Sequence, residues 1–203
     1  MFLPQPKLTD SVERLYQSNQ AAQGFVMNLT AAWAWRPDIF DSFAALRSQL
    51  ASDSGLSKRD QAVLVCATAS QLRDAYCSLA WGKTLAAEAG AEAAAAVLTG
   101  SDDGALTARD RALAAWARKV VSDPNGTTAS DVSELGYAGI DSRTIFEATA
   151  FIAFRLAFST VNDALGANPD WQLARTAPPE VRSAVTYGRP PQAAPEAVGT
   201  SGQ

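Results

Sequence analysis

Histidine is absent from this chain of 203 residues, and cysteine occurs only twice, as Cys66 and Cys77. Without histidine, the chain lacks the commonest metal ligand, the usual general base near neutral pH, and both Ser-His and Cys-His catalytic pairs. Two cysteines alone do not supply the four soft ligands of a structural zinc site. Any catalysis must therefore use carboxylates, a thiol, tyrosine, lysine or arginine, and we expect neither a metal nor a cofactor.

The chain also lacks a run of basic residues, and its formal net charge is −4. This balance argues against a nucleic-acid partner, because neutralising phosphates requires clustered lysine and arginine. No apolar stretch reaches the length of about 18 residues typical of a membrane span, and the first residues do not resemble a signal peptide. Two cysteines are too few for a disulfide scaffold. We therefore expect a cytoplasmic protein without membrane or nucleic-acid partners.

Capping signals divide most of the sequence into helices, and no segment alternates for long enough to predict a strand. The predicted helix starts are Asp10, Pro37, Ser57, Thr107, Thr128 and Asp141 or Ser142. The helix after Ser57 is expected to reach about Gln71, and another to run from Leu72 to about Ala89. A stripe of apolar residues after Pro37 predicts a core-facing surface, formed by Ile39, Phe43, Leu46 and Leu50. The fold class is therefore all-α.

Composition changes near Ala174, because five of the ten prolines lie between Pro178 and Gln203. Segments rich in proline, glycine and small residues rarely build a packed core. We therefore predict one helical domain over residues 1–173 and a flexible tail over residues 174–203.

Two segments of the chain resemble each other: residues 56–60 read LSKRD and residues 106–110 read LTARD. Both are Ser/Thr caps with an acid in the first turn, which is a common way to start a helix. They are either two similar helix starts or the traces of a duplicated helical unit.

A polar interruption lies in residues 72–82, which read LRDAYCSLAWG. On a helix, Asp74, Cys77 and Trp81 are spaced i, i+3 and i+7 and share one face. Either Asp74 caps the helix or pairs with Arg73, with Cys77 as a small buried apolar residue, or this face carries a functional site.

The stretch from residue 56 to residue 82, read as L-S-x-R-[DE] … A-Y-C-S-L-A-x-G, resembles the AhpD-like, carboxymuconolactone decarboxylase superfamily, specifically its peroxidase-related branch. The resemblance also covers residues 11–46 and 106–170, and the second range includes NDALG at 162–166. It implies an all-α, AhpD-like helical domain that forms a homo-oligomer, either a dimer or a trimer of dimers.

The motif itself departs from that branch, which reads C-x-[YH]-C-x-x-x-H after an upstream glutamate. Asp74 stands at the first cysteine, Trp81 at the histidine and Ala62 at the glutamate, while Cys77 is retained and Tyr76 precedes it. In the family the second thiol attacks peroxide and the first resolves the product. A negative charge at Asp74 disfavours a thiolate at Cys77, so we do not expect efficient peroxidase activity.

A carboxylate in place of a thiol supplies a group that can donate or accept a proton, and Trp81 adds a flat apolar wall. The leading hypothesis is a cofactor-independent enzyme of lyase, decarboxylase or isomerase type acting on a small molecule, with Asp74, Cys77 and Tyr76 as candidate catalytic residues. The alternatives are a residual single-cysteine peroxidase or oxidoreductase using Cys77, and a non-catalytic binding or assembly protein.

The long helix after Asp141 adds further polar residues. Arg155, Ser159 and Asn162 share one face, and Glu147 lies two turns earlier. They form either a buried polar network or subunit interface, or a binding site in which Arg155 anchors a substrate carboxylate. The candidate substrate-binding residues are Trp81, Arg155, Asn162 and Glu147.

Overall fold

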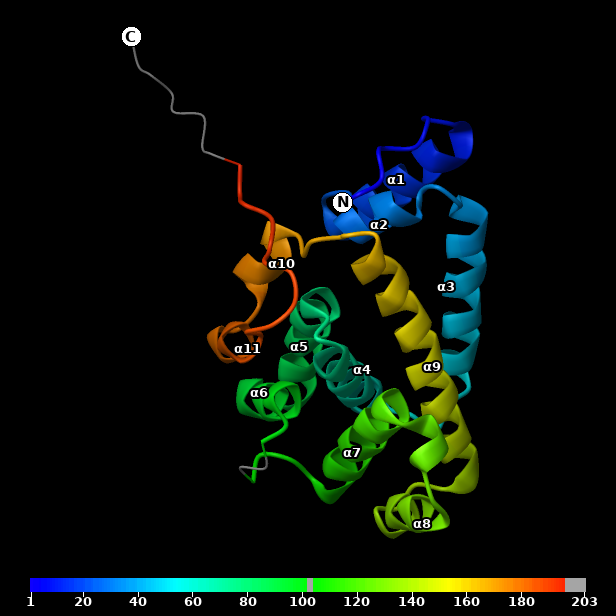
Figure 1. Ribbon diagram of the computed structural model, residues 1–203, viewed down its shortest axis with the longest axis vertical. Coiled ribbons are helices and arrows are strands. Elements are labelled where there is room, and N and C mark those ends of the chain that lie inside the picture. The colour runs from blue at the N-terminus through cyan, green and yellow to red at the C-terminus, as the bar shows by residue number, and fades with distance from the viewer. Residues whose placement is uncertain (102–103, 196–203) are drawn as a thin grey trace.

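A computed structural model describes residues 1–101 and 104–195, and these ranges contain helices and no strand, in agreement with the all-α prediction. Figure 1 shows their arrangement. In chain order the helices are α1 (Asp10–Gln23), α2 (Asn28–Trp33), α3 (Pro37–Ser52), α4 (Lys58–Leu72), α5 (Ala75–Ala89), α6 (Ala91–Thr99), α7 (Ala108–Ser122), the 3-10 turn η1 (Pro124–Gly126), α8 (Ala129–Tyr137), α9 (Ser142–Ala164), α10 (Trp171–Thr176) and α11 (Pro179–Ala184). The alanine-rich helix α6 was not among the predicted elements.

Helix α4 lies at the centre of the fold, where it packs against α5, α6, α7 and α9. Residues 62–69 are all buried, and they are apolar or small on every side of the helix. A helix that is apolar all round belongs inside a core. The segment with Asp74 and Cys77 at the start of α5 follows directly from this central helix and is buried in the interior.

Side-chain caps fix the helix starts largely as predicted. Ser57, Thr107 and Thr128 each form a capping box with an aspartate three residues later. Asp141 caps α9, whereas Thr9 caps α1 and the predicted cap Asp10 is the first helical residue. These caps satisfy backbone N–H groups that have no partner inside the helix.

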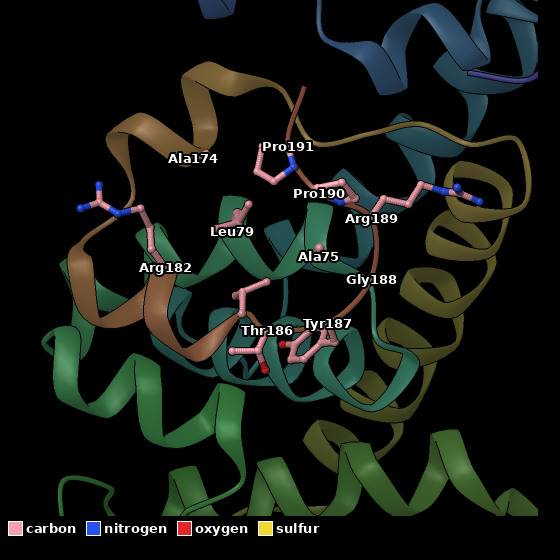
Figure 2. A pocket seen from close by; sticks show the side chains of 11 residues that line it. Ala75, Leu79, Ala174, Arg182, Thr186, Tyr187, Gly188, Arg189, Pro190 and Pro191 are labelled. Carbon is pink, nitrogen blue, oxygen red and sulfur yellow. The ribbon is translucent and has the colours of Figure 1, made fainter. Parts of the chain in front are cut away.

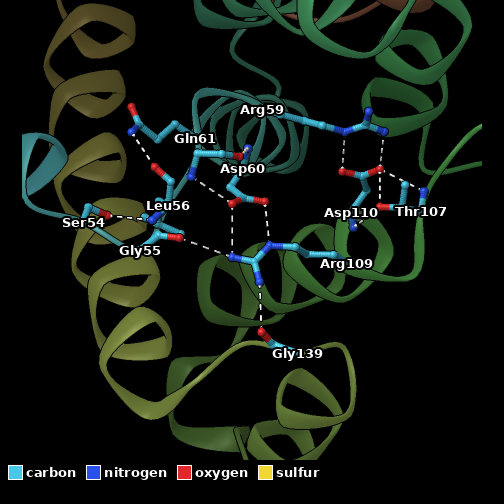
Figure 3. A network of polar contacts seen from close by, with 11 residues as sticks. Ser54, Gly55, Leu56, Arg59, Asp60, Gln61, Thr107, Arg109, Asp110 and Gly139 are labelled. Atoms are coloured by element: carbon cyan, nitrogen blue, oxygen red, sulfur yellow. Dashed lines mark hydrogen bonds and ion pairs between the residues drawn. The ribbon is translucent and has the colours of Figure 1, made fainter.

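The two similar segments, residues 56–60 and 106–110, meet through a reciprocal pair of ion pairs (Figure 3). Nε and Nη2 of Arg59 donate to the Asp110 carboxylate at 3.0 and 2.6 Å. Nε and Nη2 of Arg109 donate to the Asp60 carboxylate at 2.9 and 3.1 Å. The two segments thus make equivalent contacts with each other, as expected both of two similar helix starts and of a duplicated helical unit.

Both aspartates of this network are buried, and each also accepts a hydrogen bond from the backbone of its own N-cap residue. Burial raises the pKa of the Asp110 carboxyl, but the hydrogen bonds from Arg59 and Thr107 outweigh it and hold that pKa below its ordinary value. The network thus joins α4 to α7 through two arginine–aspartate pairs.

The prediction that the apolar stripe of α3 faces the core is right for Phe43 and Leu50, which are partly buried against the core, and wrong for Ile39 and Leu46. Helix α3 runs beside α9 (Figure 1), but none of its residues is buried, and Ile39 and Leu46 are each 44% exposed. Phe43 packs against Phe154 and Phe158 of α9, which covers only one edge of the stripe. The sequence pattern identified an apolar face correctly but not what covers it.

The predicted flexible tail over residues 174–203 is wrong for its described part. Helix α11 packs on α5 and α6, where Val181 is fully buried; a Cβ on Gly82 would lie 2.6 Å from its Cγ1. Pro179 occupies the first turn of α11, where proline fits a helix, so the prolines did not prevent order here. Residues 196–203 lie outside the described residues.

After α11 the chain returns over the start of α5 as a segment that we call the C-terminal strap, residues 185–192. The Tyr187 hydroxyl is 3.0 Å from the Ser78 hydroxyl, and Gly188 (φ 73°) packs so closely against the backbone of Arg73 and Ala75 that a Cβ would collide with it. The Gln192 N–H donates to the carbonyl of residue 169 at 2.8 Å. The strap therefore forms one wall of the region around Asp74.

Helix α9 is long and apolar enough in composition to cross a membrane, and no other helix within residues 1–101 and 104–195 is. Half of its most apolar window is buried inside the fold, against α3, α4 and α7. A core helix of this length meets the same criteria.

Candidate functional site

The turn between α4 and α5 sets the position of Asp74. Arg73 ends α4 in the left-handed region, with φ of 60°, and Asp74 is the N-cap of α5. Its Oδ1 accepts a hydrogen bond from the Cys77 N–H at 2.9 Å. Its Oδ2 has no hydrogen-bond partner, although the side chain is fully buried. The capping interpretation of Asp74 is confirmed, but capping uses only one of the two oxygens.

The Cys77 thiol faces α9. Its Sγ lies 3.5 Å from Nη2 of Arg155 and 3.6 Å from Oγ of Ser159. Burial is the main reason that the pKa of Cys77 is raised to about 12, and the charge of Asp74 raises it further. The positive charge of Arg155 acts in the opposite direction but does not compensate. Cys77 is therefore a thiol rather than a thiolate at neutral pH.

Two arginines lie beside this thiol, Arg155 from α9 and Arg47 from α3. The Arg155 side chain is 3% exposed, and its Nε has no hydrogen-bond partner. The Nε of the half-buried Arg47 is likewise buried without a partner. Burial, followed by the charge of Arg155, lowers the pKa of Arg47 to about 10. Positive charge is thus concentrated next to Cys77.

Aromatic rings surround the two guanidinium groups. The Cζ of Arg155 lies 5.2 Å from the Trp81 ring centroid and 5.3 Å from that of Phe158. The Cζ of Arg47 lies 4.9 Å from the same Phe158 ring and 5.6 Å from Phe43. Cation–π contacts of this kind partly replace the hydration that a buried cation loses. Trp81 therefore lies against the arginine next to Cys77.

A second carboxyl group, that of Asp163 near the end of α9, lies close enough to Asp74 to be affected by its charge. Burial first, and then the charge of Asp74, raise the pKa of Asp163 to about 7, while Arg189 of the strap acts in the opposite direction. Arg189 also donates from Nη2 to the Asp163 carbonyl at 3.2 Å. The strap thus places a positive charge near this carboxylate.

A pocket of about 360 Å³ opens between the strap, α10, α11 and the first turns of α5 (Figure 2). Its walls are mostly apolar, and Figure 2 shows that Arg182 and Arg189 extend away from its centre. Ala75 and Leu79, which line it, lie on the face of α5 opposite to Cys77. The pocket is adjacent to the Asp74 turn but separate from the arginine cluster.

The remaining predicted site residues lie elsewhere. The Tyr76 hydroxyl donates to the buried carboxylate of Asp170, so it is held away from the thiol. Glu147 lies near the start of α9 and accepts hydrogen bonds from the Gly55 N–H at 2.8 Å and from Arg143 Nε at 2.8 Å. The structure therefore does not bring Tyr76 and Glu147 into the site around Cys77.

Only one of the two polar side-chain atoms of Asn162 has a hydrogen-bond partner. Its Oδ1 accepts a hydrogen bond from Trp33 Nε1 at 2.8 Å, while its Nδ2 is buried without a partner. It lies less than one turn beyond Ser159 on the same face of α9. It is thus a structural residue with one unused donor.

Sequence reasoning missed Arg47 and Asp163. Arg47 follows Phe43 by four residues, so it lies one turn further along the same face of α3. An arginine beside an apolar stripe that was expected to be buried was the available signal. Asp163 is adjacent to Asn162 in the sequence, but its nearness to Asp74 depends on how α9 packs and carried no local signal.

No protein-family model matches this sequence, and no curated protein matches it either. Solved structures do. The chain is similar to a peroxidase-related protein from Ralstonia eutropha JMP134, described as an alkylhydroperoxidase AhpD core, with 26% identity, a TM-score of 0.76 and coverage of 85% of this chain and 93% of that one. A peroxidase-related protein from Silicibacter sp. TM1040 has 21% identity with the same TM-score and coverage.

A more distant structural neighbour is the debrominase Bmp8, solved as a cysteine-to-alanine variant in complex with 2,3,4-tribromopyrrole. It has 15% identity and a TM-score of 0.66 over 90% of this chain and 95% of that one. At this level of identity the likeness concerns the fold.

Proposed function

This chain belongs to the AhpD-like superfamily, and we propose that within it the protein is a cofactor-independent enzyme that acts on a small organic molecule, with Asp74 as the general acid or base. One observation carries the proposal: Asp74 is fully buried, and its Oδ2 has no partner. A buried carboxylate oxygen without a partner is costly, so its retention needs a reason. Proton transfer to a bound substrate is such a reason.

The two oxygens of Asp74 have different roles in this proposal. Oδ1 is held by the Cys77 N–H at 2.9 Å, which orients the carboxyl group. Oδ2 then takes a proton from a substrate carbon next to a carbonyl or carboxyl group. The electron pair of the broken C–H bond moves onto that group. Return of the proton to another carbon completes an isomerisation. In a decarboxylation the C–C bond breaks, carbon dioxide leaves, and a protonated Asp74 protonates the carbanion. Neither reaction needs an oxidant or a reductant.

A residual peroxidase is disfavoured by the state of Cys77. The thiolate is the nucleophile in peroxide chemistry, and a pKa of about 12 leaves almost none of it at neutral pH. The first cysteine of the family motif is replaced by Asp74, so a sulfenic acid on Cys77 would have no neighbouring thiol at that position to resolve it.

The similarity to Bmp8 is compatible with a small-molecule substrate, since that protein was solved with a halogenated pyrrole. We include self-association in the proposal, because the stripe of Ile39 and Leu46 on α3 is exposed and apolar. Analytical ultracentrifugation at micromolar concentration tests this part: a dimer or larger species is expected, and a monomer would contradict it.

Turnover assays test the enzyme proposal. The purified protein is incubated with a panel of small unsaturated and aromatic carbonyl compounds and acids, in deuterium oxide, and mass spectrometry follows consumption and deuterium incorporation. Asp74→Asn keeps the cap acceptor and should lower turnover by about 10²–10⁴-fold, the usual contribution of a general acid or base. Cys77→Ser should retain turnover. If Cys77→Ser abolishes turnover and Asp74→Asn does not, the thiol enzyme replaces this proposal; if no compound reacts, the binding-protein alternative gains support.

A further inference from the structure

Arg155 is a buried cation without an anionic partner. No carboxylate lies within ion-pair distance of its guanidinium group in the described part of the chain, and its one hydrogen bond in that part runs to the Cys77 sulfur. That sulfur is a neutral thiol at neutral pH, since its pKa is about 12. Burying an unpaired charge costs several kcal/mol, even after local relaxation. The fold therefore retains a charge that nothing in its described residues neutralises.

Arg47 makes this excess of positive charge larger. It likewise has no carboxylate within ion-pair distance among residues 1–101 and 104–195, and both guanidinium groups lie over the same Phe158 ring. Like charges that share one apolar ring repel each other more strongly than they would in water, because the local dielectric constant is low. The two arginines come from different helices, α3 and α9, so no local helix pattern forces them together.

We propose that Arg47 and Arg155 together bind the carboxylate of a small aromatic monocarboxylic acid, and that this anion is the missing partner of both side chains. The inference rests on the proposed function in one respect: it names the substrate class of the same site. The unpartnered Nε atoms of the two arginines are the donors for the carboxylate. An arginine N–H group that meets a carboxylate oxygen makes one of the stronger hydrogen bonds in proteins.

Charge balance sets the number of acidic groups. Arg47 and Arg155 contribute two positive charges, and neither has a carboxylate within ion-pair distance among the described residues. One carboxylate on the ligand supplies the missing anion, whereas a second one would bring a further negative charge next to the Asp74 carboxyl group. Asp74 Oδ2 is also unpartnered, so it remains available for the proton step.

The aromatic part of the ligand follows from the rings around the cations. The rings of Trp81, Phe158 and Phe43 lie next to the two guanidinium groups, with centroids 4.9–5.6 Å from the Cζ atoms. A planar ring next to the carboxylate gains stacking against these faces, which an aliphatic chain does not. Arg47 is half-buried and lies on α3, none of whose residues is fully buried, so its long side chain is the one that can move to admit the ligand.

Isothermal titration calorimetry with benzoate and benzamide tests this inference, because the two ligands have the same shape and differ in charge. Benzoate should bind at least about tenfold more tightly than benzamide. Arg47→Met should weaken benzoate by about tenfold or more, equivalent to the loss of about 1.4 kcal/mol, and leave benzamide unchanged. Arg36→Met is the matched control: Arg36 lies at the start of the same helix in an exposed ion pair with Asp38, and its loss should not affect benzoate.

Sulfate and chloride distinguish an organic acid from a free inorganic anion. If either one competes with benzoate at equal concentration, the site is a general anion site and the inference fails. Equal affinities for benzoate and benzamide, or an Arg47→Met variant that binds benzoate normally, would also overturn it. Asp74→Asn should retain benzoate binding while it loses turnover. If benzoate binds but no compound is turned over, the proposed function fails and this inference stands. If the protein turns over only uncharged substrates, and does so through Asp74, the proposed function stands and this inference fails.

Discussion

The reactivity of Cys77 can be predicted quantitatively, because its surroundings determine how much thiolate is present. An ordinary cysteine with a pKa of about 8.5 is about one-tenth thiolate at pH 7.5. With a pKa of about 12, Cys77 is thiolate in roughly one molecule in 30,000 at the same pH. Alkylation, which requires the thiolate, should therefore be about 3,000-fold slower than for a free cysteine, before any further loss from restricted access.

The perturbation is Asp74→Asn, which removes the negative charge but keeps an oxygen that can accept the hydrogen bond from the Cys77 N–H. It should lower the pKa of Cys77, and a shift of one unit increases alkylation about tenfold. Both forms are compared in a Cys66→Ser background, so that Cys77 is the only thiol. Asp41→Asn, an exposed position on α3, is the control and should not change the rate.

Iodoacetamide labelling followed by intact-mass spectrometry measures the rate across pH. In the protein with Asp74, the rate should rise about tenfold per pH unit, without a plateau, up to the highest pH at which the protein stays folded. A plateau near pH 8.5 would refute the reasoning, since it would mean an ordinary thiol. So would an Asp74→Asn variant that reacts no faster than its parent, because Asp74 would then have no electrostatic effect on the thiol.

Three further predictions concern stability. In urea denaturation, Asp110→Ala should lower the free energy of unfolding by about 3–4 kcal/mol, because it removes a buried ion pair and a helix cap. Arg59→Met should also cost several kcal/mol, because it leaves the Asp110 carboxyl group, which is 2% exposed, without its cation; a loss below about 1 kcal/mol would contradict this. Gly82→Ala should cost about 1–3 kcal/mol by collision with Val181, and Val181→Ala in the same chain should recover part of it. The raised pKa of Asp163 favours its protonated form in the folded state, so this residue stabilises the protein at low pH. Relative to Asp163→Asn, the unaltered protein should therefore lose stability as the pH rises from about 4 through about 7. A difference in the free energy of unfolding that stays constant across that range would contradict the shift.

The sequence predicted most of the helix starts because capping is a local interaction. Ser57 and Thr107 need only an aspartate three residues later, and both patterns are visible in the chain. Whether a helix face is buried depends instead on segments that lie far away in the sequence. The stripe on α3 has the same periodicity as a core face, yet Ile39 and Leu46 remain exposed, since their burial depends on what packs there.

The site was predictable only in part for the same reason. Asp74, Cys77 and Trp81 were found because they share one short segment with a recognisable motif. The contribution of Arg47 depends on α3 packing beside α9, which no local pattern encodes. Tyr76 was wrongly grouped with the thiol, because adjacency in sequence places its side chain about 100° around the helix, towards Asp170.

The reciprocal ion pairs have a consequence for how the protein folds and opens. They join residues 51 and 49 positions apart, so neither pair forms while the chain is only locally ordered. Docking of α4 on α7 completes both pairs in one event, and separation of the two helices breaks both. Each aspartate also holds the first turn of its own helix, so the starts of α4 and α7 lose a partner together. This part of the molecule should therefore open as one cooperative unit, whose hydrogen-exchange protection is shared by two segments far apart in the sequence.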